Sequence, residues 1–154
     1  MKLNPGAVYD QDTWVKAFPN VNLSGAQEKI LAIGMESFSS YDLPNVSLGI
    51  KDVSSGGLFT TKNTKALVVS ASFKPYVFTG IITVHIFGSL CVIGSYKLIE
   101  GQAIFEITQN VKEKKAILFR KMGNVESMDY FAALNKSVDF VVKTMVDKID
   151  EVLQ

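Results

Sequence analysis

The stretch that decides the fold is residues 80–99, GIITVHIFGSLCVIGSYKLI, in which apolar and β-branched side chains dominate. Its length would allow one helix to cross a bilayer. Two features predict strands instead. The apolar residues of 82–86 alternate with a threonine and a histidine, which is the period of a strand, and Gly80, Gly88 and Gly94 interrupt the run. We therefore predict two strands joined by a turn that starts at Gly88, and no membrane span.

The length of that turn determines which side chains share a face of the sheet. A three-residue loop at 88–90, followed by two further hairpins, gathers one apolar face: Ile82, Val84, Ile86, Val92, Tyr96, Leu98, Ala103, Phe105, Ile107, Ile117 and Phe119. A two-residue loop would instead place Ser95 and Lys97 on the face of Ile82 and Val84. Because such a slip moves a whole apolar set to the wrong side, we predict the three-residue loop.

Residues 127–153 have the pattern of a long amphipathic helix. Its apolar side chains recur at three- and four-residue spacing: Phe131, Leu134, Val138, Val141, Met145, Ile149 and Val152. Charged residues such as Lys136 and Asp139 occupy much of the remaining circumference. We predict that this helix packs across the apolar face of the sheet.

The N-terminal part is less regular. Residues 1–22 contain two prolines and several small polar residues, which predicts an irregular arm. A helix over 24–38 is favoured by Ser24 as an N-cap and Gln27 three residues later, the pattern of a capping box. A strand over 29–36 is the alternative, because a short apolar run fits either structure.

The segment 46–121 reads as strands separated by turns, including a hairpin signal in the glycine- and serine-rich residues 54–57. The predicted fold class is therefore α+β: an antiparallel meander of about five to seven strands, an N-terminal helix, and a long C-terminal helix across one face. A chain of 154 residues is the size of a single domain, so we expect one, spanning 1–154.

Composition excludes several classes of function. Lys and Arg number 16 against 15 Asp and Glu, so the net charge of +1 argues against a nucleic-acid partner. One cysteine and one histidine permit neither an internal disulfide nor a Cys/His metal cluster, and we expect no metal and no cofactor. The chain opens without an apolar leader, which predicts a cytoplasmic protein if the sequence is complete and an envelope or secreted one if a leader was removed.

The outer face of the predicted sheet is one candidate binding surface. Aliphatic and charged side chains mix there as in an interface core with a polar rim: His85, Ile93, Lys97, Ile104, Glu106, Leu118 and Arg120. This face predicts a protein partner or self-association.

The space between sheet and helix is the other candidate. Tyr96, Phe105 and Phe119 would lie opposite Phe131. These aromatic rings either line a pocket for an apolar small molecule or lipid, or simply fill the core, which is the more common outcome.

An enzyme is the alternative class, as a small hydrolase or other enzyme that uses His85 with Glu106 or Cys91. Nucleophilic catalysis also needs an oxyanion hole and a cleft, which an open sheet face does not supply. We therefore assign no catalytic residue and predict a non-catalytic binding or interaction module.

Two stretches resemble known families. Residues 95–101, SYKLIEG, with two glycines at 56–57 and a long final helix, resemble the plant pollen-allergen family with the helix-grip fold, which implies a hydrophobic ligand between sheet and helix. Residues 129–134 and onward are similar to the last helix of small accessory lipoproteins of bacterial envelopes. Too few residues follow Gly101 for the first family's three further strands, and the second family's lipobox is absent, so neither family is assigned.

Overall fold

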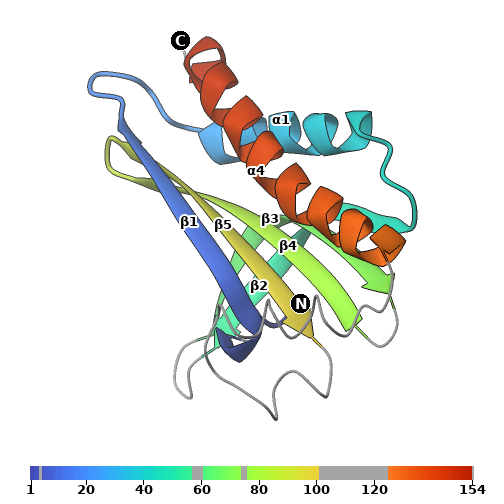
Figure 1. Ribbon diagram of the computed structural model, residues 1–154. Helices are drawn as coiled ribbons and strands as arrows, with labels where there is room; N and C mark the ends of the chain where they lie inside the picture. Colours follow the sequence, from blue (N-terminus) through green and yellow to red (C-terminus); the bar gives the residue numbers. More distant parts are fainter. Residues whose placement is uncertain (4, 57–60, 74–75, 101–124, 154) are drawn as a thin grey trace.

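The computed structural model describes residues 1–3, 5–56, 61–73, 76–100 and 125–153 (Figure 1). The elements in chain order are a 3-10 turn η1 (Pro5–Ala7), β1 (Val8–Ala17), α1 (Ala26–Ser40), β2 (Val46–Gly56), β3 (Thr61–Phe73), β4 (Tyr76–Phe87), β5 (Leu90–Glu100) and α4 (Val125–Leu153). The five strands form one antiparallel sheet in the order β1-β5-β4-β3-β2. The predicted α+β class is confirmed; the strands expected between 101 and 121 lie outside the described residues.

Both helices lie on the same side of the sheet and pack against each other (Figure 1). The predicted stripe of α4 is confirmed, since six of its side chains have no exposed surface: Phe131, Leu134, Val138, Val141, Met145 and Ile149. Two glycines allow the close approach. A Cβ on Gly80 would lie 2.7 Å from Cγ2 of Val138, and one on Gly34 would lie 2.8 Å from Sδ of Met145. The space between sheet and helices is therefore filled by side chains in this region.

The β4–β5 turn has two residues, so the predicted three-residue loop is wrong. Phe87 pairs with Leu90, and Gly88 takes a φ of 61°, the conformation that favours glycine at the first position of a tight hairpin turn. The residues of β5 are consequently shifted by one relative to the prediction. Ser95 and Lys97 lie on the helix-covered face, together with Ile82 and Val84 on β4, while Tyr96 and Leu98 lie on the opposite face.

The reason is that both faces of β5 are covered, so alternation of polar and apolar residues does not report its orientation. Lys97 is only 3% exposed, yet its ammonium has two partners: Asp139 of α4 at 2.8 Å and Asp10 of β1 at 3.4 Å. A buried charge with such partners is tolerated on a face that the sequence pattern marks as apolar.

The N-terminal arm predicted for 1–22 is also wrong, because residues 8–17 form the edge strand β1, paired with β5 over its whole length apart from one bulge between Val8 and Asp10. Trp14 and Lys16 of this strand face the helices, and the Lys16 ammonium lies 2.7 Å from a carboxylate oxygen of Asp150 on α4. Polar residues in β1 hide the alternation of buried and exposed side chains that would identify a strand in the sequence. Pairing with β5 stabilises the extended conformation of this segment.

The first three residues pair with the other edge of the sheet. Leu3 donates its backbone N–H to Ser54 of β2 at 2.8 Å, whereas Val8 already pairs with Leu98 of β5. In a flat sheet, five strand spacings of about 4.8 Å would separate these two edges by about 24 Å, but five residues reach at most about 18 Å. The sheet must therefore curl at this end, toward the face on which Ala7 is buried.

The helix predicted over 24–38 is confirmed as an element, with different ends. It begins at Ala26 after Gly25, whose φ is 73°, and no side chain caps it. Ser24 therefore does not form the predicted capping box, and the amide of Gln27 instead donates to the backbone carbonyl of Val84 on β4 at 2.8 Å. The alternative strand over 29–36 is excluded.

Candidate functional site

The sheet face turned away from the helices carries a second and smaller apolar cluster. Its buried members come from η1 and four strands: Ala7, Val53, Ala66, Val68, Ile81 and Leu98. Leu3, Val8 and Tyr96 pack against it and remain partly exposed. The curl of the sheet thus encloses a small core on this face.

A cleft of about 110 Å³ opens beside this cluster. It is lined by aliphatic and polar side chains together: Leu3, Val53, Thr64, Ile81, Thr83, His85 and Tyr96. We call it the His85 pocket, after the one histidine of the chain. Its residues come from the N-terminal segment and from β2, β3, β4 and β5, so the curl and the strand register bring them together.

Four polar groups point into this otherwise aliphatic pocket. The hydroxyl oxygen of Thr64 lies 3.3 Å from Nε2 of His85. The other two hydroxyls, on Thr83 and Tyr96, overlie Gly94: a Cβ there would lie 2.8 Å from Oγ1 of Thr83 and 3.3 Å from Oη of Tyr96. A glycine at this position therefore leaves room for both hydroxyls beside the pocket.

An exposed apolar patch borders the pocket. The His85 ring stacks on Phe87 with 5.7 Å between centroids and 19° between planes. Phe87 is 63% exposed, and Leu90, its partner in the hairpin, is 42% exposed. Val15 of β1 is 54% exposed and reaches the same face, because it pairs with Val92, which pairs with His85. We call Val15, Phe87 and Leu90 the tip patch.

The predicted binding face is only partly brought together. His85 lies on the face away from the helices, as expected, but Ile93 and Lys97 are buried on the helix-covered face because of the two-residue turn. Their assignment to an outer binding face is wrong. Ile104, Glu106, Leu118 and Arg120 lie outside the described residues.

The predicted pocket between sheet and helix is not formed by the residues proposed for it. Tyr96 and Phe131 lie on opposite faces of the sheet. The Phe131 ring is fully buried against Tyr9 and Phe78, with centroid distances of 6.0 and 6.1 Å, so it fills the core. Phe105 and Phe119 lie outside the described residues.

The structure excludes a catalytic pair of His85 and Cys91. The two residues point to opposite faces, since Cys91 belongs to the helix-covered core and is fully buried. Burial also raises the pKa of the Cys91 thiol, which makes it a poorer nucleophile at neutral pH. The other proposed partner of His85, Glu106, lies outside the described residues.

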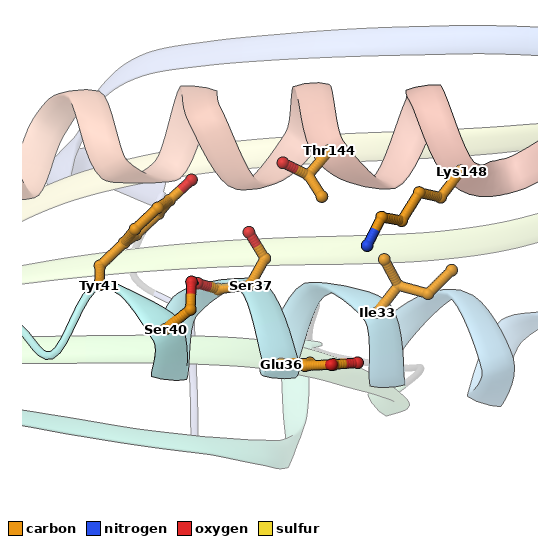
Figure 2. A pocket seen from close by; sticks show the side chains of 7 residues that line it. All are labelled: Ile33, Glu36, Ser37, Ser40, Tyr41, Thr144 and Lys148. Atoms are coloured by element: carbon orange, nitrogen blue, oxygen red, sulfur yellow. The ribbon is translucent and has the colours of Figure 1, made fainter.

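A second hollow, of about 280 Å³, lies on the solvent side of the seam between α1 and α4 (Figure 2). Its lining is Ile33, Glu36, Ser37, Ser40, Tyr41, Thr144 and Lys148. Figure 2 shows the hydroxyls of Ser37 and Tyr41 directed toward α4, and the ammonium of Lys148 directed from α4 toward Ile33. We call this hollow the helix-seam groove.

Sequence reasoning proposed neither this groove nor five of the seven residues that line the His85 pocket as site residues: Leu3, Val53, Thr64, Ile81 and Thr83. The signal for the groove was present in the short hydroxyl side chains of Ser37 and Ser40, which follow one another on one side of a helix. No local pattern marks the pocket residues, because they lie on segments far apart in sequence.

Neither a metal cluster nor a membrane span is found in the part of the chain that the structure describes. No three His, Cys, Asp or Glu side chains there are grouped as metal ligands. No helix among those residues is long and apolar enough to cross a bilayer.

Comparison with known proteins assigns no family. No protein-family profile and no curated protein matches the chain. Among solved structures, the chain has a distant likeness to the crystal structure of the di-domain ARO/CYC StfQ from the steffimycin biosynthetic pathway. The sequence identity is 11%, the TM-score is 0.28, and the match covers 90% of this chain but only 52% of that one.

Proposed function

We propose that this protein is a non-catalytic binding module and that the His85 pocket with the tip patch is its ligand site. The ligand class is an apolar small molecule that carries one hydrogen-bonding head group, such as a phenol. The observation that supports this most directly is the convergence of one imidazole and three hydroxyls in an aliphatic cleft bordered by exposed apolar side chains. Ligand sites commonly combine apolar walls with a few placed polar groups.

The sizes of the two parts suggest how the ligand divides between them. A cavity of about 150 Å³ can hold benzene, so a pocket of about 110 Å³ accommodates the hydroxyl of a phenol and the adjoining part of its ring, and not the whole ligand. The apolar body would then lie over Phe87 and Leu90, which together offer the exposed surface. Covering such surface contributes roughly 25 cal/mol per Å² of apolar area.

Binding accounts for the lining better than catalysis does. A histidine that activates a nucleophile needs a third group to orient its ring. Among the described residues, the hydroxyl of Thr64 alone lies within hydrogen-bonding distance of Nε2, and the described pocket lining contains no carboxylate and no thiol. The same imidazole and hydroxyl groups are well suited to form hydrogen bonds with a ligand hydroxyl.

The test uses NMR of the imidazole of His85, which is unambiguous because the chain has one histidine. 4-Butylphenol is titrated against butylbenzene, which lacks the hydroxyl. We expect a saturable shift of the His85 signal with the phenol, and binding of butylbenzene about 5- to 150-fold weaker, since an unpaired buried polar group costs about 1–3 kcal/mol.

Variants locate the site. Tyr96→Phe removes one hydroxyl and Phe87→Ser removes the largest part of the tip patch; each should weaken 4-butylphenol several-fold. Tyr41→Phe and Ile50→Ser are matched controls, because Tyr41 lines the helix-seam groove and Ile50 is 44% exposed on β2 away from the pocket. A His85 signal that does not shift saturably, or that shifts equally in all four variants, would contradict the proposal.

Self-association through the tip patch is the second candidate function, supported by the exposure of Val15, Phe87 and Leu90 at one end of the sheet. It predicts a sedimentation coefficient that rises with protein concentration and that Phe87→Ser returns to the monomer value. A sedimentation coefficient independent of concentration in the unmodified protein would exclude it.

A further inference from the structure

We propose that the helix-seam groove between α1 and α4 is a second, separate binding site, and that it takes a small carboxylate bearing several hydroxyl groups. The groove lies on the far side of the helices from the His85 pocket, so this inference does not depend on the proposed function.

The shape of the groove follows from side-chain length. Ser37 and Thr144 are short and lie along its middle, whereas the longer Tyr41, with Ser40 beside it, and Lys148 lie toward its two ends (Figure 2). On the inner side of the seam, the approach of Met145 to Gly34 and the burial of the α4 stripe fix the distance between the helices. A hollow of about 280 Å³ between two fixed helices has the room of about nine water molecules at about 30 Å³ each. Covalently bonded atoms lie closer together than water molecules do, so the groove suits a ligand with somewhat more non-hydrogen atoms than that, such as a six-carbon hydroxy acid.

The exposed Lys148 lies at one end of the groove. Elsewhere on the sheet and α4, Lys16 pairs with Asp150, and Lys97 pairs with Asp139 and Asp10. Among the described residues, Lys148 has no carboxylate within ion-pair distance, and its ammonium is directed into the groove (Figure 2). A carboxylate there would accept a charge-assisted hydrogen bond, the strongest kind available on such a surface.

The rest of the lining offers complementary neutral groups. The hydroxyls of Ser40 and Thr144 donate to backbone carbonyls within their own helices, at 2.6 and 3.0 Å, and this leaves their oxygen lone pairs to accept from a ligand. The hydroxyls of Ser37 and Tyr41 are directed toward α4 and can donate. Glu36, on the α1 rim, adds an acceptor for a ligand hydroxyl and disfavours a second negative charge. One carboxylate with several hydroxyls matches this set.

The probe is gluconate, with sorbitol as the neutral polyol of the same carbon number. Amide chemical shifts of the ¹⁵N-labelled protein are followed across residues 33–41 and 144–148. We expect gluconate to shift these amides saturably with a Kd of about 1 mM or tighter, and sorbitol to bind at least about tenfold more weakly because it lacks the charge-assisted contact.

Lys148→Met keeps an unbranched side chain that is one atom shorter and removes its charge, so it should weaken gluconate about tenfold. Lys143→Met is the matched control, since Lys143 is exposed on the same helix and does not line the groove; gluconate should bind that variant as it binds the unmodified protein. Both positions are exposed, so neither change threatens folding. The proposal is overturned by the absence of saturation, by equal binding of sorbitol, or by equal weakening in the Lys143 variant, which would indicate general charge attraction only.

Discussion

The two faces of the sheet differ in how completely they are covered. On the helix-covered face, two helices bury a continuous core in which glycines replace larger residues so that Val138 and Met145 can approach. The opposite face has a six-residue buried cluster, a cleft and an exposed tip patch. As far as the described residues extend, side chains fill the helix-covered face, whereas the other face keeps polar groups in an unfilled space.

This difference suggests that one face of the sheet supplies stability and the other supplies the binding site. Burial of apolar surface is the dominant stabilising term in folding, so most of the stability should come from the helix-covered face. Ligand sites require concave, incompletely filled surface, which the other face provides. Changes on the two faces should therefore affect different measurements, and four predictions test this.

The largest contrast should be between two phenylalanines. Phe131→Ala removes a fully buried ring on the helix-covered face and should lower the free energy of unfolding by about 3–5 kcal/mol. Phe87→Ala, at a 63% exposed position, should change it by about 0.5 kcal/mol or less. Urea unfolding, followed by the fluorescence of Trp14, measures both. If Phe131→Ala does not fold, Phe131→Leu is the milder substitution to compare with Phe87→Ala. Similar losses of unfolding free energy at the two positions would contradict the assignment of stability to the helix-covered face.

Two glycines sharpen the same contrast. Gly80→Ala places a methyl 2.7 Å from Val138 and 2.9 Å from Val69 in a filled core, and should cost about 1–3 kcal/mol. Gly94→Ala meets the hydroxyl end of Thr83 at 2.8 Å, which can move toward the pocket. Its cost in stability should be less than half as large, while its affinity for 4-butylphenol should fall. The reverse order of thermal midpoints would show that the pocket face is packed as tightly as the other.

Lys97 and its two carboxylate partners test whether the helix-covered face is stabilised mainly by apolar burial or by ion pairs. Asp139→Asn should cost about 1–2 kcal/mol, because it leaves buried Lys97 with only Asp10, while the half-exposed position of Asp139 limits the loss. Lys97→Met should stay within about 1 kcal/mol of the unmodified protein, since an apolar side chain can replace a buried cation. Chemical denaturation measures the free energy of unfolding of both variants. A larger loss in Lys97→Met than in Asp139→Asn would mean that the ion pairs are the main stabilising contribution on this face.

The smallest effect concerns Tyr9, whose buried hydroxyl donates to Oδ1 of Asn135 at 2.8 Å. Burial raises the pKa of this hydroxyl, and the charges of Asp10 and Asp139 raise it further. The folded state therefore keeps a proton that the unfolded chain loses above a pKa of about 10, so the stability that Tyr9 contributes is present below that pH and declines above it.

Tyr9→Phe should accordingly cost about 1 kcal/mol near neutral pH, through the lost hydrogen bond. The difference from the unmodified protein should shrink above about pH 10, where ionisation opposes folding of the tyrosine form only. Unfolding measured on both sides of that pH tests this. A difference that stays constant or grows with pH would show that the Tyr9 hydroxyl is not buried as described.

The elements that sequence reasoning predicted well are those with a strong local signal. The α4 stripe from Phe131 to Ile149 repeats over many turns and meets water on its other side, so its period identifies both the helix and its buried face. Edge strand β1 has no such signal. Its Asp10, Asp12 and Lys16 hide the alternation, and only pairing with β5 makes it a strand.

Of the candidate site, the sequence singled out His85 and Tyr96 but placed them on opposite faces. The error came from one residue in the β4–β5 turn. Lys97 is polar and therefore predicted to face water, but in the fold it meets Asp139 and Asp10, which lie 42 residues further along and 87 residues earlier in the chain. A local sequence pattern cannot predict that distant carboxylates will neutralise a buried lysine.

Taken alone, the sequence determined the class of the fold, the two helices, and the buried stripe of α4. Elements with one buried side and one solvent-exposed side repeat their apolar residues at the helical or strand period, and that period can be read from neighbouring residues. The tertiary structure decided the register of β5, the conversion of residues 8–17 into a strand, and the meeting of Leu3, Thr64 and His85 at one pocket. Those features depend on which distant segment covers each face of a strand. A strand that is covered on both faces shows no clear alternation of polar and apolar residues, so its sequence does not indicate which face meets the helices.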